Sequence, residues 1–257
     1  MLHLFATLLA SHAPAAGLHQ LVLAAPELAR LGLPGQSIAI ALAGPGSSDP
    51  LLRAALPLAC LDPTAGTVTL LWTPTAALRP LTERAVGTSL DVLGPIGHGW
   101  PIAPATRNLL LIGVADAAAP LLALTEAALR QRLAVTLVLG APIGPGLPTS
   151  LVPPAAEYTL GRGLDPAAAA LAAVDDALLR WADAIYLALP RTAWPVVANR
   201  LRHVRVRWDR GLAHAHSDIA LPCAVGVCGA CALATKKGLR LACVDGPVFD
   251  LRDVSDG

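Results

Sequence analysis

Four cysteines near the C-terminus have the residue type and the spacing of metal ligands. Four residues separate Cys223 from Cys228, two separate Cys228 from Cys231, and Cys243 follows after eleven more. Thiolates bind iron strongly, and this spacing is typical of the cysteines that hold a [2Fe–2S] cluster. Small residues such as Gly226 fill the loop, which lets backbone N–H groups approach the sulfurs. The sequence therefore predicts a [2Fe–2S] site.

Two other uses of the four cysteines stay open at this point. A structural zinc site with four thiolates usually has two Cys-x2-Cys pairs, and only Cys228 and Cys231 have that spacing. Disulfides or unreacted thiols are the second alternative, although the chain has no convincing export signal. The fifth cysteine, Cys60, lies alone in an apolar run, and we expect it to pack in a core.

The composition of the chain gives no indication of nucleic acid or of a membrane as a partner. The 257 residues are 54% hydrophobic and 14% charged, with a net charge of +1, so nothing indicates nucleic acid as a partner. The apolar runs are shorter than the roughly 20 residues of a spanning helix, and we expect no membrane segment. The first ten residues lack a basic start and favour a β-strand over a signal peptide, so a cytoplasmic protein is predicted.

The elements that must position the cysteines fall into three stretches. Residues 1–100 contain short β-prone runs between Gly and Pro clusters, which predicts a small β-barrel. Residues 101–210 alternate strand and helix patterns, which predicts an α/β domain with a parallel sheet. In this stretch Asp165 is expected to cap a helix that runs to Trp181, and 203–208 alternates like a strand. Residues 211–257 form a small domain that a cluster would stabilise.

The chain resembles a known family at several places in order. The run from Cys223 through Lys236, and Cys243-Val-Asp-Gly-Pro-Val-Phe249 after it, are similar to the end of the electron transfer subunits of dihydroorotate dehydrogenase. Upstream, 33–36, 51–53, 66–72 and 91–100 resemble the barrel segments of the same family. The similarity therefore covers nearly the whole chain.

This resemblance implies a ferredoxin-reductase-like FAD barrel, a nucleotide-binding α/β domain and a cluster domain. It also implies a hetero-oligomer with an FMN-containing catalytic subunit, in pyrimidine biosynthesis. The flavin contacts map onto Arg53, Leu56, Trp72 and Thr73. In this chain the family's flavin motif keeps its arginine, Arg53, but lacks the hydroxyl that follows it. The family's Tyr-Arg pair is replaced by Trp72-Thr73. Retention and loss of FAD therefore both stay open.

The nicotinamide side departs further from the family. In the family a glycine-rich turn lets the backbone approach the pyrophosphate of the dinucleotide. Residues 113–120 take the place of this turn here, and they carry side chains at Val114, Ala115 and Ala117. Asp116 would add a negative charge at that place. The Cys-Gly-Pro segment that borders the nicotinamide in the family is replaced by Ala-Leu-Pro at residues 188–190. These substitutions argue against NAD binding.

The predicted function is an electron-transfer subunit, a component of an oxidoreductase rather than its substrate-converting subunit. It would take electrons from the catalytic subunit through the cluster, and through FAD if retained, to an acceptor such as ferredoxin. The alternative is a structural or regulatory iron–sulfur subunit without reductase activity. Six arginines between 191 and 210 form either a solvated face or a docking surface for an acidic partner.

Overall fold

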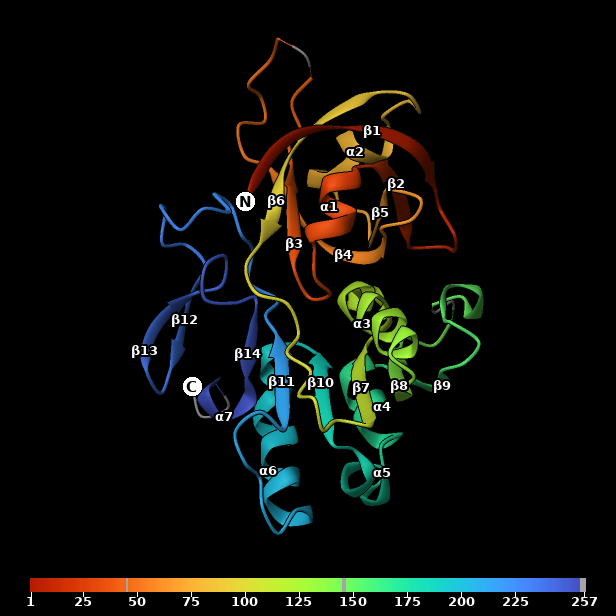
Figure 1. The fold of residues 1–257 in the computed structure, drawn as a ribbon, viewed down its shortest axis with the longest axis vertical. Coiled ribbons are helices and arrows are strands. Elements are labelled where there is room, and N and C mark those ends of the chain that lie inside the picture. Colours follow the sequence, from red (N-terminus) through yellow and green to blue (C-terminus); the bar gives the residue numbers. More distant parts are fainter. Residues whose placement is uncertain (45, 145–146, 255–257) are drawn as a thin grey trace.

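The structure of the protein is a computed structural model that describes residues 1–44, 46–144 and 147–254. A barrel lies at one end of the molecule and a sheet covered by helices lies at the other (Figure 1). A hairpin and a short C-terminal helix sit beside the sheet. None of the described helices is long and apolar enough to cross a membrane.

Six antiparallel strands close the barrel in the order β1-β2-β5-β4-β3-β6. Burial alternates along β2 and β6 because successive side chains point to opposite faces, and Leu, Ile and Val fill the barrel interior. Helix α1 packs on β4 and β5, and the short α2 precedes β6. The bounds are β1 Leu2–His12, β2 His19–Ala24, α1 Pro26–Leu31, β3 Ser37–Ile40, β4 Ala54–Asp62, β5 Thr67–Trp72, η1 Ala76–Leu78, α2 Arg79–Thr82 and β6 Ser89–Ile96.

The second sheet has the order β14-β11-β10-β7-β8-β9, and only β14 is antiparallel to its neighbour. In β7, Leu109 and Leu111 face α3, while Leu110 and Ile112 face the side of α4, α5 and α6. Burial on both faces explains the continuous apolar run of this strand. The bounds are β7 Asn108–Val114, η2 Ala115–Ala117, α3 Ala119–Arg130, β8 Ala134–Ala141, η3 Thr149–Leu151, β9 Glu157–Arg162, α4 Pro166–Ala172, α5 Asp176–Trp181, β10 Ala184–Ala188, η4 Arg191–Ala193, α6 Trp194–Val204, β11 Ala213–His216 and β14 Val248–Asp250.

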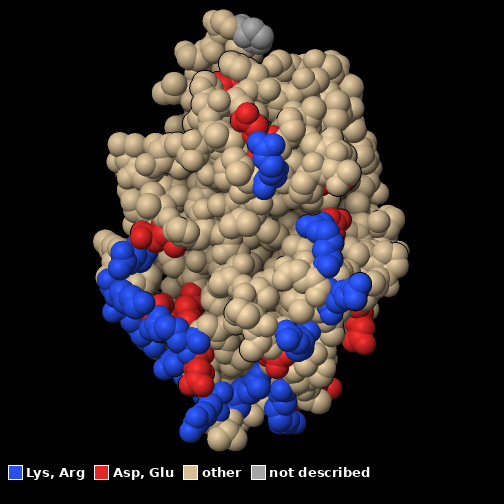
Figure 2. All heavy atoms as spheres, viewed as in Figure 1, with Lys and Arg blue, Asp and Glu red and all other residues tan. Residues whose placement is uncertain are grey.

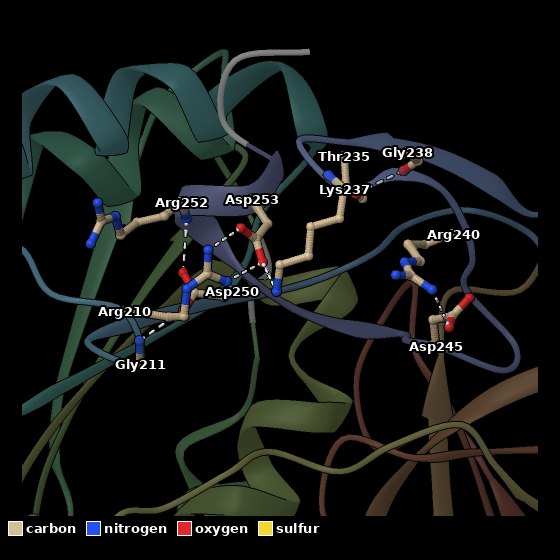
Figure 3. Close-up of polar contacts among 10 residues, drawn as sticks. All are labelled: Arg210, Gly211, Thr235, Lys237, Gly238, Arg240, Asp245, Asp250, Arg252 and Asp253. Atoms are coloured by element: carbon tan, nitrogen blue, oxygen red, sulfur yellow. Dashed lines mark hydrogen bonds and ion pairs between the residues drawn. The ribbon is translucent and has the colours of Figure 1, made fainter.

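The remaining elements are a hairpin of β12 (Ala232–Thr235) and β13 (Gly238–Leu241), and helix α7 (Leu251–Val254). An ion pair joins them, because Asp253 on α7 binds Lys237 in the hairpin turn, and Asp253 also binds Arg210, which precedes β11 (Figure 3). Strands β11 and β14 fall within 211–257 but pair in the second sheet. A separate cluster domain over 211–257 therefore remains a proposal, and its hairpin is the part that stands outside the sheet.

Two local predictions can be compared with the structure. Asp165 caps α4, with its carboxylate accepting hydrogen bonds from the N–H groups of Ala167 and Ala168. The single helix expected up to Trp181 is instead two, because Asp175 caps a second helix through the N–H of Leu178. The strand expected at 203–208 is wrong: α6 continues to Val204, and no strand forms in the segment that follows.

Candidate functional site

The fold gathers the four predicted cysteine ligands from two loops. Cys223, Cys228 and Cys231 lie between β11 and β12, and Cys243 follows β13. Cys231 and Cys243 are buried with their sulfurs 3.4 Å apart, whereas Cys228 is exposed. The hairpin makes this meeting inevitable, because pairing of Ala232 with Leu241 brings the residues flanking it together.

Backbone amides surround the sulfur of Cys223. Hydrogen bonds from the N–H groups of Cys228 and Val225 lower the pKa of the Cys223 thiol to about 6. Burial, and then the neighbouring Cys231 thiol, raise the pKa of Cys243, while the N–H of Gly226 acts in the opposite direction. Amides aimed at sulfur favour the thiolate, which is the form that binds a metal. The loop is therefore preorganised for an anionic metal–sulfur group.

The donor set fits a [2Fe–2S] cluster. Such a cluster takes four thiolates in two pairs, one pair for each iron. The thiols in contact here are Cys223 with Cys228 and Cys231 with Cys243. No group of three or more His, Cys, Asp or Glu side chains poised around one ion occurs among the described residues. Gly226 has a φ of +81°, and a Cβ there would lie 2.7 Å from Val244, so the loop requires glycine.

A cavity of about 400 Å³ lies where the barrel, the sheet and the approach to the cysteine loop meet. The barrel contributes Ser37 and Trp72, and the ends of β7 and β10 contribute Val114 and Ala188. The segment 216–221 closes another side. Leu221 lines the cavity two residues before Cys223, and Pro247 does so four residues after Cys243. The cavity and the cysteine loop are therefore adjacent.

The four predicted flavin residues are not all brought to this cavity. Trp72 lines it, packs against His19 at 5.0 Å between ring centroids, and has a buried Nε1 without a hydrogen-bond partner among the described residues. Leu56 is buried in the barrel core, and Thr73 is exposed. Arg53 is not among the lining residues and instead binds Asp91. Their assignment as flavin contacts thus remains a proposal, strongest for Trp72.

The turn that departs from the nicotinamide motif also borders the cavity. Asp116, Ala117 and Pro120 line it, together with Leu189 and Pro190. The family-like glycine turn is replaced by η2, a single 3₁₀ turn whose residues carry side chains. A carboxylate at this rim opposes the approach of a phosphate.

Sequence reasoning missed His216 and Asp218 as cavity residues. Both line the cavity, and the Nε2 atom of His216 is buried without a hydrogen-bond partner among the described residues. Burial lowers the pKa of His216 to about 4, although hydrogen bonds with the main chain of Gly35 and Ser217 act to raise it. The one sequence signal that could have indicated them is the pair of histidines flanking Ala215 shortly before the cysteines.

Cys60 has more than a packing role. It is half-buried on β4, and its thiol donates a hydrogen bond to Glu126 of α3 at 3.0 Å. Burial, and then Glu126, raise its pKa to about 12. Cys60 therefore joins the barrel to the α/β layer as a neutral thiol.

Most of the Lys and Arg side chains visible in Figure 2 lie in the lower half of the molecule, with a continuous group at its lower left. Nine of the 19 Lys and Arg residues lie between 200 and 252. Carboxylates neutralise part of this charge, because Asp176 binds Arg200 and Asp253 binds Arg210. A hollow of about 260 Å³ in this region is lined by Arg202, Arg205, Val206, Trp208, Lys236 and Arg252.

The cysteine segment and the chain as a whole are similar to known proteins. Residues 220–255 match the family model of the iron–sulfur cluster binding domain of dihydroorotate dehydrogenase B. The chain is 28% identical over 250 residues to the dihydroorotate dehydrogenase B (NAD(+)) electron transfer subunit of Shouchella clausii, covering 92% of each. It is 32% identical to that of a Geobacillus species, over 133 residues that cover 50% of this chain and 51% of the relative.

Solved structures share the fold. An NADH-dependent reduced ferredoxin-NADP oxidoreductase superposes with a TM-score of 0.79 at 20% identity, covering 98% of this chain and 90% of that one. Phthalate dioxygenase reductase superposes with a TM-score of 0.64 at 13% identity, covering 94% of each chain. The barrel and the parallel sheet thus define a ferredoxin-reductase-like fold, and the predicted fold is confirmed.

Within that class the cysteine segment is the distinguishing part. With this segment, and at 28% identity along 92% of its length, the chain is similar to the dihydroorotate dehydrogenase B electron transfer subunits.

Proposed function

We propose that this protein is the electron-transfer subunit of a dihydroorotate-oxidising complex in pyrimidine biosynthesis. Its partner would be an FMN-containing catalytic subunit in the cytoplasm. The [2Fe–2S] cluster would be held by Cys223, Cys228, Cys231 and Cys243, and it supplies a one-electron carrier when bound. The observation that carries the proposal is the adjacency of the cysteine loop and the cavity at Leu221 and Pro247.

The residues around the cysteines suit this role. Main-chain amides stabilise negative charge on Cys223, and the apolar core that includes Cys231 and Cys243 keeps water from the inner sulfurs. The outer edge is different, because Val225, Val227 and Cys228 are exposed. An apolar exposed edge beside the ligands is a suitable contact for the catalytic subunit.

The second cofactor would be FAD, with its ring in the cavity. Leu71, Trp72 and Leu221 offer the apolar walls that a flavin ring needs. No Lys or Arg occurs among the described residues that line the cavity, whereas Asp116 and Asp218 do. We therefore assign the ring, and not the diphosphate, to the cavity. For the same reason we propose a soluble carrier such as ferredoxin, in place of NAD, as the acceptor.

The test uses the protein purified without oxygen, alone and together with the catalytic subunit. We expect iron, sulfide and flavin in the preparation, and bleaching of the cluster absorption by dihydroorotate only when the catalytic subunit is present. Oxidised ferredoxin should then restore the absorption faster than NAD. A cluster that dihydroorotate cannot reduce in the complex would refute electron transfer and favour a structural subunit.

A further inference from the structure

The segment that leads from β11 to the cysteine loop carries a buried polar side-chain atom without a hydrogen-bond partner among the described residues, Nε2 of His216. His216 is the last residue of β11 and lines the cavity, as do the residues that follow it up to Leu221. Its Nε2 has no hydrogen-bond partner among the described residues and is shielded from solvent. A buried donor or acceptor left unpaired destabilises the folded protein, so a partner is expected. The cavity is where that partner can sit.

Packing fixes the orientation of the His216 ring. The centroid of Trp100 lies 5.8 Å from that of His216, and Trp100 also packs edge-on against Tyr186 at 5.4 Å. The indole Nε1 of Trp100 donates to the carbonyl of Pro120, and the hydroxyl of Tyr186 donates to that of Pro101. Each of these two neighbours is therefore held by its own hydrogen bond. His216 can contact an occupant of the cavity without rearranging them.

The same cavity defines the kind of ligand. Its walls are mainly apolar, its charged lining residues are Asp116 and Asp218, and both carboxylates are exposed at its rim. Ser37, which is buried, is a further polar group on the barrel side. Arg191 neutralises Asp218 through an ion pair at 2.9 Å, whereas no ion pair of Asp116 occurs among the described residues. The carboxylate of Asp116 therefore disfavours an anionic ligand, and a neutral flat ring with hydrogen-bonding edges matches the apolar walls.

We propose that Nε2 of His216 hydrogen-bonds the flavin ring in this cavity. Because no Lys or Arg occurs among the described residues that line it, the site should bind the ring with similar affinity whether or not phosphate groups are attached. This inference rests on the proposed function, because it takes the occupant to be the flavin of the electron-transfer subunit. A neutral imidazole has one N–H donor and one acceptor, so it can pair with a polar edge of the ring. The low pKa of His216 keeps it neutral at physiological pH.

The experiment titrates the purified, cluster-containing and flavin-free protein with riboflavin, FMN and FAD, following quenching of flavin fluorescence. We expect similar affinities for the three flavins. His216→Leu should weaken each affinity by about five- to tenfold, the loss of one hydrogen bond. His216→Gln, which keeps a polar group, should recover part of the loss. The absorption maximum of bound riboflavin should shift in His216→Leu relative to the parent.

The matched control is His214→Phe. His214 lies on the same strand and stacks on Tyr186, but it does not line the cavity, so this variant should bind flavin as the parent does. Equal affinity of His216→Leu and the parent would overturn the proposal, as would a parent that binds no flavin. Reduction of the cluster by dihydroorotate through the catalytic subunit tests the proposed function separately. That reduction would persist if only the assignment of His216 is wrong.

Discussion

The guanidinium of Arg53 binds the carboxylate of Asp91 through both terminal nitrogens, at 2.9 Å and 2.7 Å. One of these nitrogens also donates to the main-chain carbonyl of Asp91, and His3 lies 2.8 Å from the same carboxylate. The cation that the family resemblance assigns to the flavin is thus used to join the start of β4 to β6. The sequence alone could not reveal this, since Asp91 is 38 residues away.

The first prediction concerns this pair. The hydrogen bond from Arg53 lowers the pKa of Asp91 below its ordinary value of 3.8. The pair therefore stabilises the fold above that pH, and the contribution is lost as the pH falls through the ordinary value toward the lowered one. Asp91→Asn should reduce the free energy of unfolding by about 1 kcal/mol near pH 7, because the pair is only partly exposed.

Urea unfolding of parent and variant near pH 7 and near pH 3 tests this. The difference should shrink at the lower pH, because Asp91 becomes protonated in the unfolded chain before it does in the folded protein. Glu83→Gln is the control, since the Arg79–Glu83 pair is exposed and should contribute little. An equal difference at both pH values would contradict the prediction.

The second prediction concerns the metal ligands. Replacing Cys223, Cys228, Cys231 or Cys243 by serine should remove iron and sulfide together and lower the melting temperature. Cys60→Ser is the matched control, because the Cys60 thiol is committed to Glu126 and should not bind iron. Metal and sulfide analysis of the five variants distinguishes the sites. Zinc in place of iron would refute the cluster, and iron lost in Cys60→Ser would show that the ligand set is wrong.

The third prediction concerns the contact between the barrel exit and the cluster loop. Gly97 has a φ of +73°, and a Cβ there would lie 2.2 Å from the carbonyl oxygen of Gly246, three residues after Cys243. Gly97→Ala should therefore displace this loop as well as strain the backbone. We expect a lower melting temperature and faster loss of the cluster absorption in air.

Gly87→Ala separates the two effects. Gly87 has a φ of +88°, but nothing lies within 4 Å of an added Cβ, so only the backbone cost of about 1–2 kcal/mol applies. Its cluster should be as durable as that of the parent. If Gly87→Ala loses the cluster as fast as Gly97→Ala, crowding at Gly246 is not the cause.

The fourth prediction concerns Asp253, which binds Arg210 and Lys237 (Figure 3). Asp253→Asn should loosen the hairpin relative to α7, because it removes the charge that both cations share. Amide hydrogen exchange in β12 and β13 should accelerate, while exchange in β7 stays unchanged. The parent in about 1 M salt should approach the variant, since the Debye length is then about 3 Å. No change in β12 and β13 would mean that other contacts hold the hairpin.

The ligand chemistry is local in sequence, and this is why it was accessible without a structure. Four cysteines at fixed spacing with Gly226 between them constrain a tight loop, whatever surrounds it. Strand and helix patterns likewise follow from local periodicity, so the barrel and the parallel sheet were predictable. Short segments were less so. Asp175 ended one helix and began another, and α6 extended through His203, since capping and tertiary packing outweighed weak alternation.

The sequence by itself determined the metal-binding residue types, the order of the elements and the loss of the glycine turn at 113–120. Only the tertiary structure decided which side chains meet at the cavity. Trp72, Asp116 and His216 come from three separate parts of the chain, and Arg53 is turned away by Asp91. Contacts between distant segments depend on the packing of whole layers, which no local pattern of residues encodes.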